Sequence, residues 1–365
     1  MNGPAFAEGL LAEADAAIGA GRTLPARWYT APAVFDLELR EIFGRTWTPF
    51  GIQHGLDEDG DYATDLVSGV PVLMTRSRGR VRAFLNACRH RGHPVAEGRG
   101  RADSFRCRYH GWTYDPNGAL VDAPRADREP EFDRSGLCLP EVGAAEWGPL
   151  KLVNPDPSAP AFDAAFASLI EIAGRSGLQL DSLRCRATES RVIQCNWKLL
   201  YENFAECYHC ATVHPAFAAV HGVEPHEYEV EIHDRFIHSR SPRREPDAVD
   251  AWEGFAAWPG WSLARGDDPS VVFATTLAPE AVGRTRVITH VFAGDDVREA
   301  TIERELAGWW FATYEEDGAV CSAVQRSLVA GAFEQGPILL DSESAIRDLQ
   351  VKLRDSLAGA GGSDD

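Results

Sequence analysis

Long apolar runs are missing from this 365-residue sequence. No stretch reaches the roughly 18 consecutive apolar residues that mark a membrane-spanning helix, so we expect no transmembrane segment. Residues 1–22 also lack the basic leader of a secretory signal, and they carry Glu8, Glu13 and Asp15, which a transit peptide would avoid. We therefore expect a cytoplasmic protein that begins with a short amphipathic surface helix.

Positive charge and cysteine are both scarce. The chain has 36 Lys and Arg against 55 Asp and Glu, a formal net charge of −19, which argues against nucleic acid or an anionic membrane as its main partner. Eight cysteines in a chain of this length are too few for a disulfide scaffold. In a cytoplasmic protein they should be thiols or metal ligands.

The sequence pattern changes near residue 155. Between residues 46 and 153 short strand-like segments alternate with turns: PVLMTR and VRAFLN flank SRGR, and Asn117-Gly118 is a strong hairpin signal. Residues 153–160 read as a linker, and longer helical and strand patterns follow. The last helical pattern places Ile346, Leu349, Leu353 and Leu357 on one side. We expect a small all-β domain beside a larger α+β domain.

Two short segments each pair one cysteine with one histidine: Cys88-x-His90 and Cys107-x-x-His110. Four such ligands could hold zinc in a Cys₂His₂ site. A [2Fe–2S] cluster with two thiolates on one iron and two imidazoles on the other needs the same donors. CRHRG and CRYHGWTYDPNG resemble the two cluster-binding loops of a Rieske domain, which implies that these four residues bind the cluster. His93 matches no ligand position and should have a loop or packing role.

The stretch ENFAECYHCATVHP contains a second set of candidate ligands. Its Cys207-x-x-Cys210 pair is compatible with zinc or redox chemistry, whereas His209 and His214 suit the two-histidine, one-carboxylate sites of non-haem Fe(II) oxygenases. Histidines five residues apart do not share one regular helical face, so His214 should lie past a helix end or distortion, just before Pro215. The segment NWKLLYENFAECYHCATVHP resembles the mononuclear-iron segment of Rieske non-haem iron oxygenase α subunits.

The resemblance implies roles for two carboxylates. In EEDGAVCSAVQRSL it places Asp317 at the third iron-ligand position, with Glu315 and Glu316 as rivals; a charge cluster at a helix N-terminus is the plainer alternative. Ser322 stands where the family pattern usually has Glu. Glu206 stands where the family usually has Asp, a bridge from His209 to the Rieske histidine of a neighbouring subunit, here His110. Cys207 and Cys210 would then be helix-packing thiols.

The resemblance covers nearly the whole chain and implies an α+β fold: an all-β Rieske [2Fe–2S] domain plus a helix-grip catalytic domain, an antiparallel sheet around a long C-terminal helix. The expected division is 1–43, a lead-in belonging to the catalytic domain; 44–155, the Rieske domain; 156–357, the mononuclear-iron catalytic domain; and 358–365, a flexible tail. The family also implies a homotrimer. No flavin- or nicotinamide-binding glycine pattern is present, so NAD(P)H electrons should arrive through a separate flavin and iron–sulfur reductase or a ferredoxin.

These features predict the terminal oxygenase component of a Rieske mono- or dioxygenase system, which hydroxylates or oxidatively demethylates a small organic substrate. ENF-x-ECYHC is similar to the branch that oxidises choline, glycine betaine and carnitine, so a quaternary ammonium substrate is expected. An aromatic cage for it could draw on several residues. The candidates are Tyr201, Trp252, Trp258, Trp261, Trp309 and Trp310. The alternatives are an aromatic or alicyclic substrate in an apolar pocket, a Rieske electron carrier without oxygenase activity, and a zinc-stabilised interaction module.

Overall fold

The computed structural model describes residues 4–245, 251–307 and 311–359. The chain forms two compact units, one made of Met1–Phe43 and Arg186–Asp365 and the other of Gly44–Cys185. We call them the larger and the smaller unit. Among the described helices, none combines the length and the apolar character needed to cross a membrane.

The smaller unit consists of two antiparallel sheets. One has the strand order β1-β10-β9-β4-β3-β2-β5 and the other β6-β7-β8. Their bounds are β1 Thr48–Pro49, β2 Asp61–Val67, β3 Val70–Ser77, β4 Arg80–Leu85, β5 Arg99–Arg101, β6 Phe105–Arg106, β7 Thr113–Tyr114, β8 Leu120–Asp122, β9 Glu141–Trp147 and β10 Leu150–Asn154.

The two predicted hairpins of this unit are confirmed. Strands β3 and β4 pair through a turn in which Arg78 and Gly79 have φ of 54° and 75°, the left-handed pair that a two-residue hairpin turn requires. The Asn117–Gly118 turn joins β7 to β8. Gly118 is needed there, because its φ is 81° and a Cβ atom would lie 2.6 Å from the ring of Phe84.

The smaller unit extends beyond the expected boundary at residue 155. Helices α4 (Phe162–Ala165) and α5 (Ala167–Arg175) belong to it. The ring of Phe162 packs edge-on against Trp47 at 5.7 Å between centroids, and a Cβ at Gly148 would lie 2.6 Å from Leu180. These contacts explain why residues 156–185 group with the preceding strands rather than with the larger unit.

The larger unit contains a seven-stranded sheet of order β11-β17-β16-β15-β14-β13-β12, in which every neighbouring pair from β12 to β17 is antiparallel. Its strands are β11 Arg184–Ile193, β12 Glu229–Ile232, β13 Phe236–Ser241, β14 Trp252–Ala257, β15 Trp261–Arg265, β16 Val271–Ala281 and β17 Arg284–Ala293. Its helices are α1 Pro4–Ala20, α2 Arg27–Thr30, α3 Pro32–Glu41, α6 Trp197–Phe204, α7 Cys210–Val213, α8 Pro215–Val220, α9 Glu299–Glu305, α10 Phe311–Val329 and α11 Ser344–Ala358.

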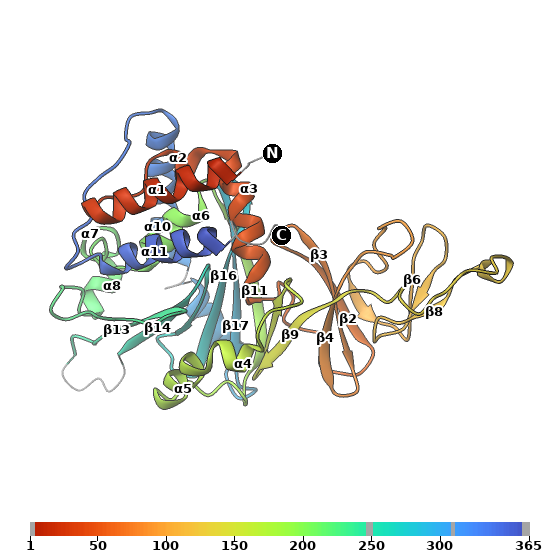
Figure 1. The fold of residues 1–365 in the computed structure, drawn as a ribbon. Helices are drawn as coiled ribbons and strands as arrows, with labels where there is room; N and C mark the ends of the chain where they lie inside the picture. The colour runs from red at the N-terminus through yellow and green to blue at the C-terminus, as the bar shows by residue number, and fades with distance from the viewer. Residues whose placement is uncertain (1–3, 246–250, 308–310, 360–365) are drawn as a thin grey trace. The chain divides into compact units, whose positions relative to one another are not determined.

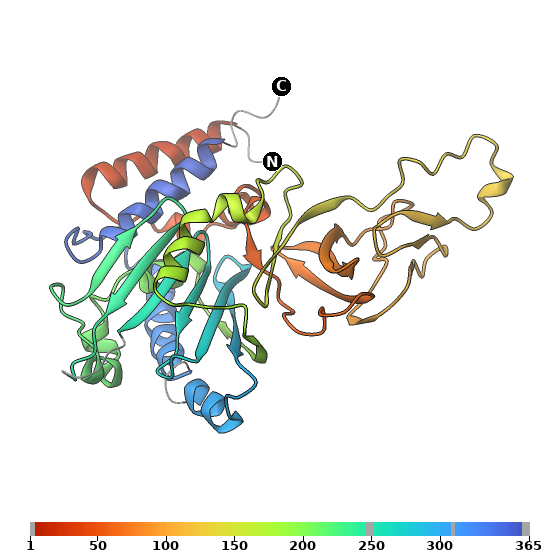
Figure 2. The same cartoon turned by 90° about the horizontal axis from the view of Figure 1, so that it is seen from below.

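Helices α1, α10 and α11 lie on one side of this sheet, and α1 runs beside α11 (Figures 1 and 2). The predicted stripe on α11 is confirmed. Its four residues, Ile346, Leu349, Leu353 and Leu357, are all buried. The expected α+β class, an all-β domain plus an antiparallel sheet packed against a long C-terminal helix, is therefore correct.

A fully buried ion pair joins α3 to α6 in this core. Lys198 Nζ lies 2.6 Å from Glu38 Oε1, and both side chains are completely excluded from solvent. The indole N–H of Trp197 donates to the other oxygen of Glu38 at 2.8 Å. The pair fixes α6, the helix that leads into the segment containing His209 and His214.

Candidate metal centres

Two loops of the smaller unit share one backbone design. In each, the carbonyl of a cysteine accepts a hydrogen bond from the N–H of a glycine four residues later: Gly92 to Cys88 at 2.8 Å and Gly111 to Cys107 at 2.9 Å. Both glycines have positive φ, 72° and 77°. The residue pattern C-x-H-x-G and C-x-x-H-G thus folds into two equivalent turns, because only glycine adopts this backbone conformation without strain.

These loops separate the sulfur donors from the nitrogen donors. Cys88 and Cys107 are only 3% and 2% exposed, whereas His90 and His110 are exposed and their ring centroids lie 4.5 Å apart. Burial raises the pKa of Cys107, and the adjacent Cys88 thiol adds to the rise. Two inner thiols and two outer imidazoles fit a [2Fe–2S] cluster whose inner iron takes sulfur and whose outer iron takes nitrogen.

Tyr114 is a neighbour of this centre that sequence reasoning missed. Its side chain is completely buried, its hydroxyl lies 3.4 Å from Cys88 Sγ, and it accepts the backbone N–H of Arg89 at 2.9 Å. Hydrogen bonds to cluster sulfurs tune the potential of an iron–sulfur centre. His93 lies beside the loop with its Nδ1 2.7 Å from the carbonyl of Pro94.

The second candidate centre forms where the helix is interrupted. Helix α6 ends at Phe204, His209 directly precedes the one-turn α7, and His214 lies between α7 and α8 with φ −116° and ψ 66°. Pro215 then occupies the first turn of α8. The prediction that His214 lies past a helix end is confirmed, and this break lets both imidazoles point to one spot.

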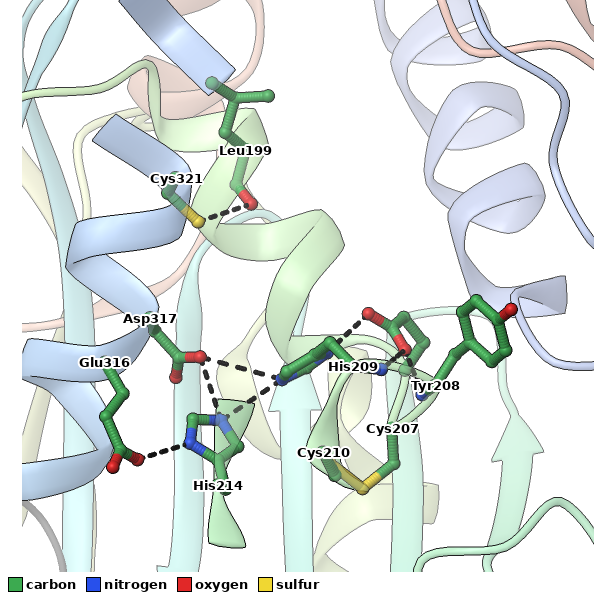
Figure 3. A network of polar contacts seen from close by, with 10 residues as sticks. Leu199, Cys207, Tyr208, His209, Cys210, His214, Glu316, Asp317 and Cys321 are labelled. Atoms are coloured by element: carbon green, nitrogen blue, oxygen red, sulfur yellow. Dashed lines mark hydrogen bonds and ion pairs between the residues drawn. A yellow bond between two sulfur atoms is a disulfide. The ribbon is translucent and has the colours of Figure 1, made fainter. Parts of the chain in front are cut away.

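Asp317 reaches the same spot from α10. Its Oδ1 lies 2.9 Å from His214 Nε2 and 3.6 Å from His209 Nε2, and the two Nε2 atoms are 3.2 Å apart (Figure 3). Ligands bound at about 2.1 Å and at right angles are roughly 3 Å apart, so this spacing suits three ligands on one face of a metal. In the described part of the chain, no other group of three or more potential ligands is as close.

Each imidazole is held by a carboxylate at its other nitrogen. Glu206 Oε1 lies 2.5 Å from His209 Nδ1, and Glu316 Oε2 lies 2.7 Å from His214 Nδ1. Burial acts to lower the pKa of His214, but its bonds to Asp317 and Glu316 outweigh burial and raise that pKa overall. This arrangement leaves Nε2 of each histidine facing the three-residue group, as is typical of histidines that bind a metal.

The two rival carboxylates have other partners. Glu316 contacts His214 from the side away from the three-residue group, and Glu315 pairs with Arg191 at the surface. Asp317 is the sixth residue after the start of α10 and is 2% exposed. It is therefore no part of a solvated charge cluster at a helix N-terminus.

Cys207 and Cys210 are not thiols, and the expectation that they are is wrong. They form a disulfide, with their Cα atoms 4.9 Å apart. The turn between α6 and α7 brings them within the 4.4–6.8 Å or so that a disulfide bridges, and the backbone N–H of Cys210 donates to the carbonyl of Cys207. The disulfide closes the turn that carries Tyr208 and His209.

A cavity of about 120 Å³ opens beside the three-residue group. Its lining is mostly apolar and aromatic. In the described part of the chain, its aromatic lining residues are Phe204, Phe217, Tyr228, Trp252, Phe255 and Tyr314. Sequence reasoning missed all of these except Trp252, although Phe204 and Tyr314 lie within a few residues of the expected ligands.

Of the predicted cage residues, Trp252 alone lines the cavity in the described part of the chain. Trp258 and Tyr201 pack against each other in the core at 5.9 Å, and Trp261 is 2% exposed on β15. Trp309 and Trp310 lie outside the described residues. The expectation is thus wrong for Tyr201, Trp258 and Trp261, which are buried away from the cavity.

Comparison with known proteins agrees with both centres. Residues 46–140 match the Rieske [2Fe–2S] domain, and residues 180–359 match the catalytic domain of ring-hydroxylating alpha subunits. The chain belongs to the family of Rieske non-haem iron oxygenase α subunits. It is an oxygenase of the type that contains a Rieske cluster and a mononuclear non-haem iron and that receives electrons from a separate reductase.

The relatives include oxygenases of small ammonium compounds. The carnitine monooxygenase oxygenase subunit of Acinetobacter baumannii is 26% identical over 88% of this chain and 89% of its own length. The chloroplastic choline monooxygenase of Beta vulgaris is 28% identical over 92% of this chain and 77% of its own length. The solved structure of the quaternary ammonium Rieske monooxygenase CntA with L-carnitine shares the fold, with a TM-score of 0.81, 24% identity, and coverage of 96% and 98% of the two chains.

Proposed function

We propose that this chain oxidises a quaternary ammonium compound, with Cys88, His90, Cys107 and His110 holding the Rieske cluster. His209, His214 and Asp317 would hold the mononuclear iron, which supplies the activation of O₂ when bound. The observation that carries the proposal is the cavity: an aromatic, mostly apolar chamber that begins at these three side chains.

The cavity suits a substrate that is cationic and poorly hydrated. Phe217, Tyr228 and Trp252 line it, and the rings of Phe217 and Trp252 meet edge to face at 5.9 Å. Aromatic rings attract an ammonium group through their electron-rich faces. The named activities of the carnitine and choline relatives support the same substrate class.

The proposed reaction hydroxylates a carbon attached to the ammonium nitrogen. It consumes O₂, two electrons and two protons, and it yields the carbinol cation and water. Loss of a proton and cleavage of the C–N bond then leave a tertiary amine and an aldehyde. The chain itself contributes substrate orientation, exclusion of water by the aromatic walls, and the fixed imidazoles of the iron site.

Electrons would cross between subunits through Glu206. Its carboxylate already bonds His209, and His110 is exposed in the smaller unit, as an inter-subunit contact requires. This route implies the homotrimer that is usual in the family. It also implies a separate flavin and iron–sulfur reductase, or a ferredoxin, as the electron donor that uses NAD(P)H.

Metal analysis and turnover together test the proposal. The purified protein should contain about three irons and two acid-labile sulfides per chain and show a Rieske-type EPR signal after dithionite reduction. Asp317→Ala should keep the cluster signal and lose one iron. With a reductase, a trimethylammonium substrate should yield an amine and an aldehyde only in O₂. Oxidation of aromatic hydrocarbons instead would point to the alternative substrate class, and zinc without sulfide would refute both centres.

A further inference from the structure

The cavity walls, as far as the structure describes them, carry no fixed positive charge. Among the described residues that line it, none is Lys or Arg. The residues outside the described ranges are also free of Lys and Arg in sequence. The charged side chains that border the cavity are Glu206 and Asp317, both acidic, beside His209 and His214.

The two basic side chains on β13, β14 and β15 pair with carboxylates of the sheet. Arg265 on β15 is directed to Glu253, at 3.7 Å, and Arg240 on β13 to Glu229, at 3.8 Å. Strand alternation places both on the face opposite to Ser239 and Ser262, which line the cavity. Neither arginine is among the described residues that line the cavity.

A substrate carboxylate would be poorly accommodated in this cavity. With the N-methyl carbon placed at the iron site, the carboxylate would lie toward the strand walls, lose its hydration and find no Lys or Arg among the described lining residues. The uncharged polar groups of Ser239, Ser262 and Thr313 can instead hydrogen-bond a hydroxyl or an amide. The cavity therefore distinguishes between two kinds of ammonium compound, those with and those without an anionic substituent.

We propose, on the basis of the function proposed above, that the substrates are N-methylated ammonium cations whose other substituents are uncharged. Zwitterions that carry a carboxylate, such as carnitine and glycine betaine, are excluded. The determinant is the absence of a cationic side chain from the walls formed by β13, β14 and β15.

Matched ligand pairs test this directly on the metal-loaded enzyme. One pair is glycine betaine and its amide; the other is γ-butyrobetaine and butyltrimethylammonium. Each uncharged member should bind, by titration calorimetry, and turn over with a kcat/KM at least about 100-fold above that of its carboxylate partner. Equal values, or preference for the carboxylates, would overturn this inference while leaving a quaternary ammonium function intact. If no member of either pair binds or reacts, the quaternary ammonium function itself fails.

A second experiment tests whether the missing cationic side chain in the cavity wall determines this selectivity. Ser262→Arg adds a cation to the cavity wall, and Ser262→Gln adds similar bulk without charge. With both metal centres verified by iron content and EPR, the arginine variant should shift the preference at least about tenfold toward the carboxylates, and the glutamine variant should not. An unchanged preference in a metal-loaded arginine variant would overturn the assignment. Should that variant fail to fold, the ligand pairs on the unmodified enzyme still decide.

Discussion

Glu316 Oε2 lies 2.7 Å from Nδ1 of His214, so the carboxylate next to Asp317 in the sequence holds the imidazole from the side opposite to Asp317. Successive helical residues point about 100° apart, because an α-helix has roughly 3.6 residues per turn. The three side chains therefore point in different directions: Glu315 to Arg191, Glu316 to Nδ1 of His214, and Asp317 to Nε2 of His214.

Glu316→Gln should weaken iron binding without abolishing it. The amide keeps a hydrogen-bonding group near His214 but loses the charge that orients and polarises the ring, and loss of such partners typically costs about 10- to 100-fold in metal affinity. Fe(II) titration of iron-depleted enzyme measures this effect. Glu315→Gln is the matched control and should leave the affinity unchanged; equal losses in both variants would show that the effect is not specific to the histidine contact.

Glu206→Gln should separate metal binding from electron delivery. Both centres should remain, because the ring nitrogen of His209 that Glu206 contacts is Nδ1, not the Nε2 that faces His214 and Asp317. Coupled turnover should nearly vanish, since the proposed bridge between His209 and the partner subunit's cluster needs the carboxylate. Single-turnover oxidation of the reduced cluster, followed optically, is the measurement. Glu206→Asp, the residue usual in the family, should retain part of the rate, and an unimpaired Gln variant would remove the bridging role.

The Cys207–Cys210 disulfide predicts a specific labelling pattern. Alkylation of denatured protein without reductant should modify Cys138, which is exposed and free, but neither Cys207 nor Cys210. Reduction before alkylation should label both. Peptide mass spectrometry resolves the two cases, and labelling of both cysteines without reductant would contradict the disulfide. The spacing allowed this bond, but the expectation of a cytoplasmic, reducing compartment favoured thiols over it.

Metal-ligand types and local turns could be predicted from sequence, whereas the direction of side chains could not. The Cys-x-His and Cys-x-x-His pairs, and the Arg78–Gly79 turn, depend on neighbours within a few residues. Which tryptophans reach the cavity depends on strand pairing across the whole sheet, so Trp258 and Trp261 resemble Trp252 in sequence and differ from it in environment. The cavity's lack of cationic walls is likewise a property of the assembled sheet.

The buried ion pair between Lys198 and Glu38 should be essential for stability. Glu38→Ala leaves the ammonium group without its partner inside the core, which typically costs about 3–5 kcal/mol in the free energy of unfolding. Denaturant titration followed by tryptophan fluorescence measures it. Glu229→Ala, which removes an exposed pair with Arg240, is the control and should cost at most about 1 kcal/mol. Similar losses in both variants would contradict the importance of burial.

Glu202 should make stability depend on pH. Burial raises the pKa of Glu202 to about 7 from its ordinary 4.5, although a hydrogen bond donated by Tyr29 opposes the rise. Between these two pH values the folded carboxyl keeps a proton that the unfolded chain has released, so this contribution to stability is complete below pH 4.5 and is lost as pH rises toward 7.

Glu202→Gln tests that dependence, because an amide does not titrate. Relative to the variant, the unmodified protein should lose thermal stability steadily between about pH 4.5 and pH 7. Above that range, the plots of melting temperature against pH should run parallel for the two proteins. Tyr29→Phe removes the hydrogen bond that lowers the pKa of Glu202 and should extend the loss to higher pH. Differential scanning calorimetry in matched buffers gives the comparison. A constant difference between the two proteins from pH 4.5 to 7 would show that Glu202 stays ionised in the folded state.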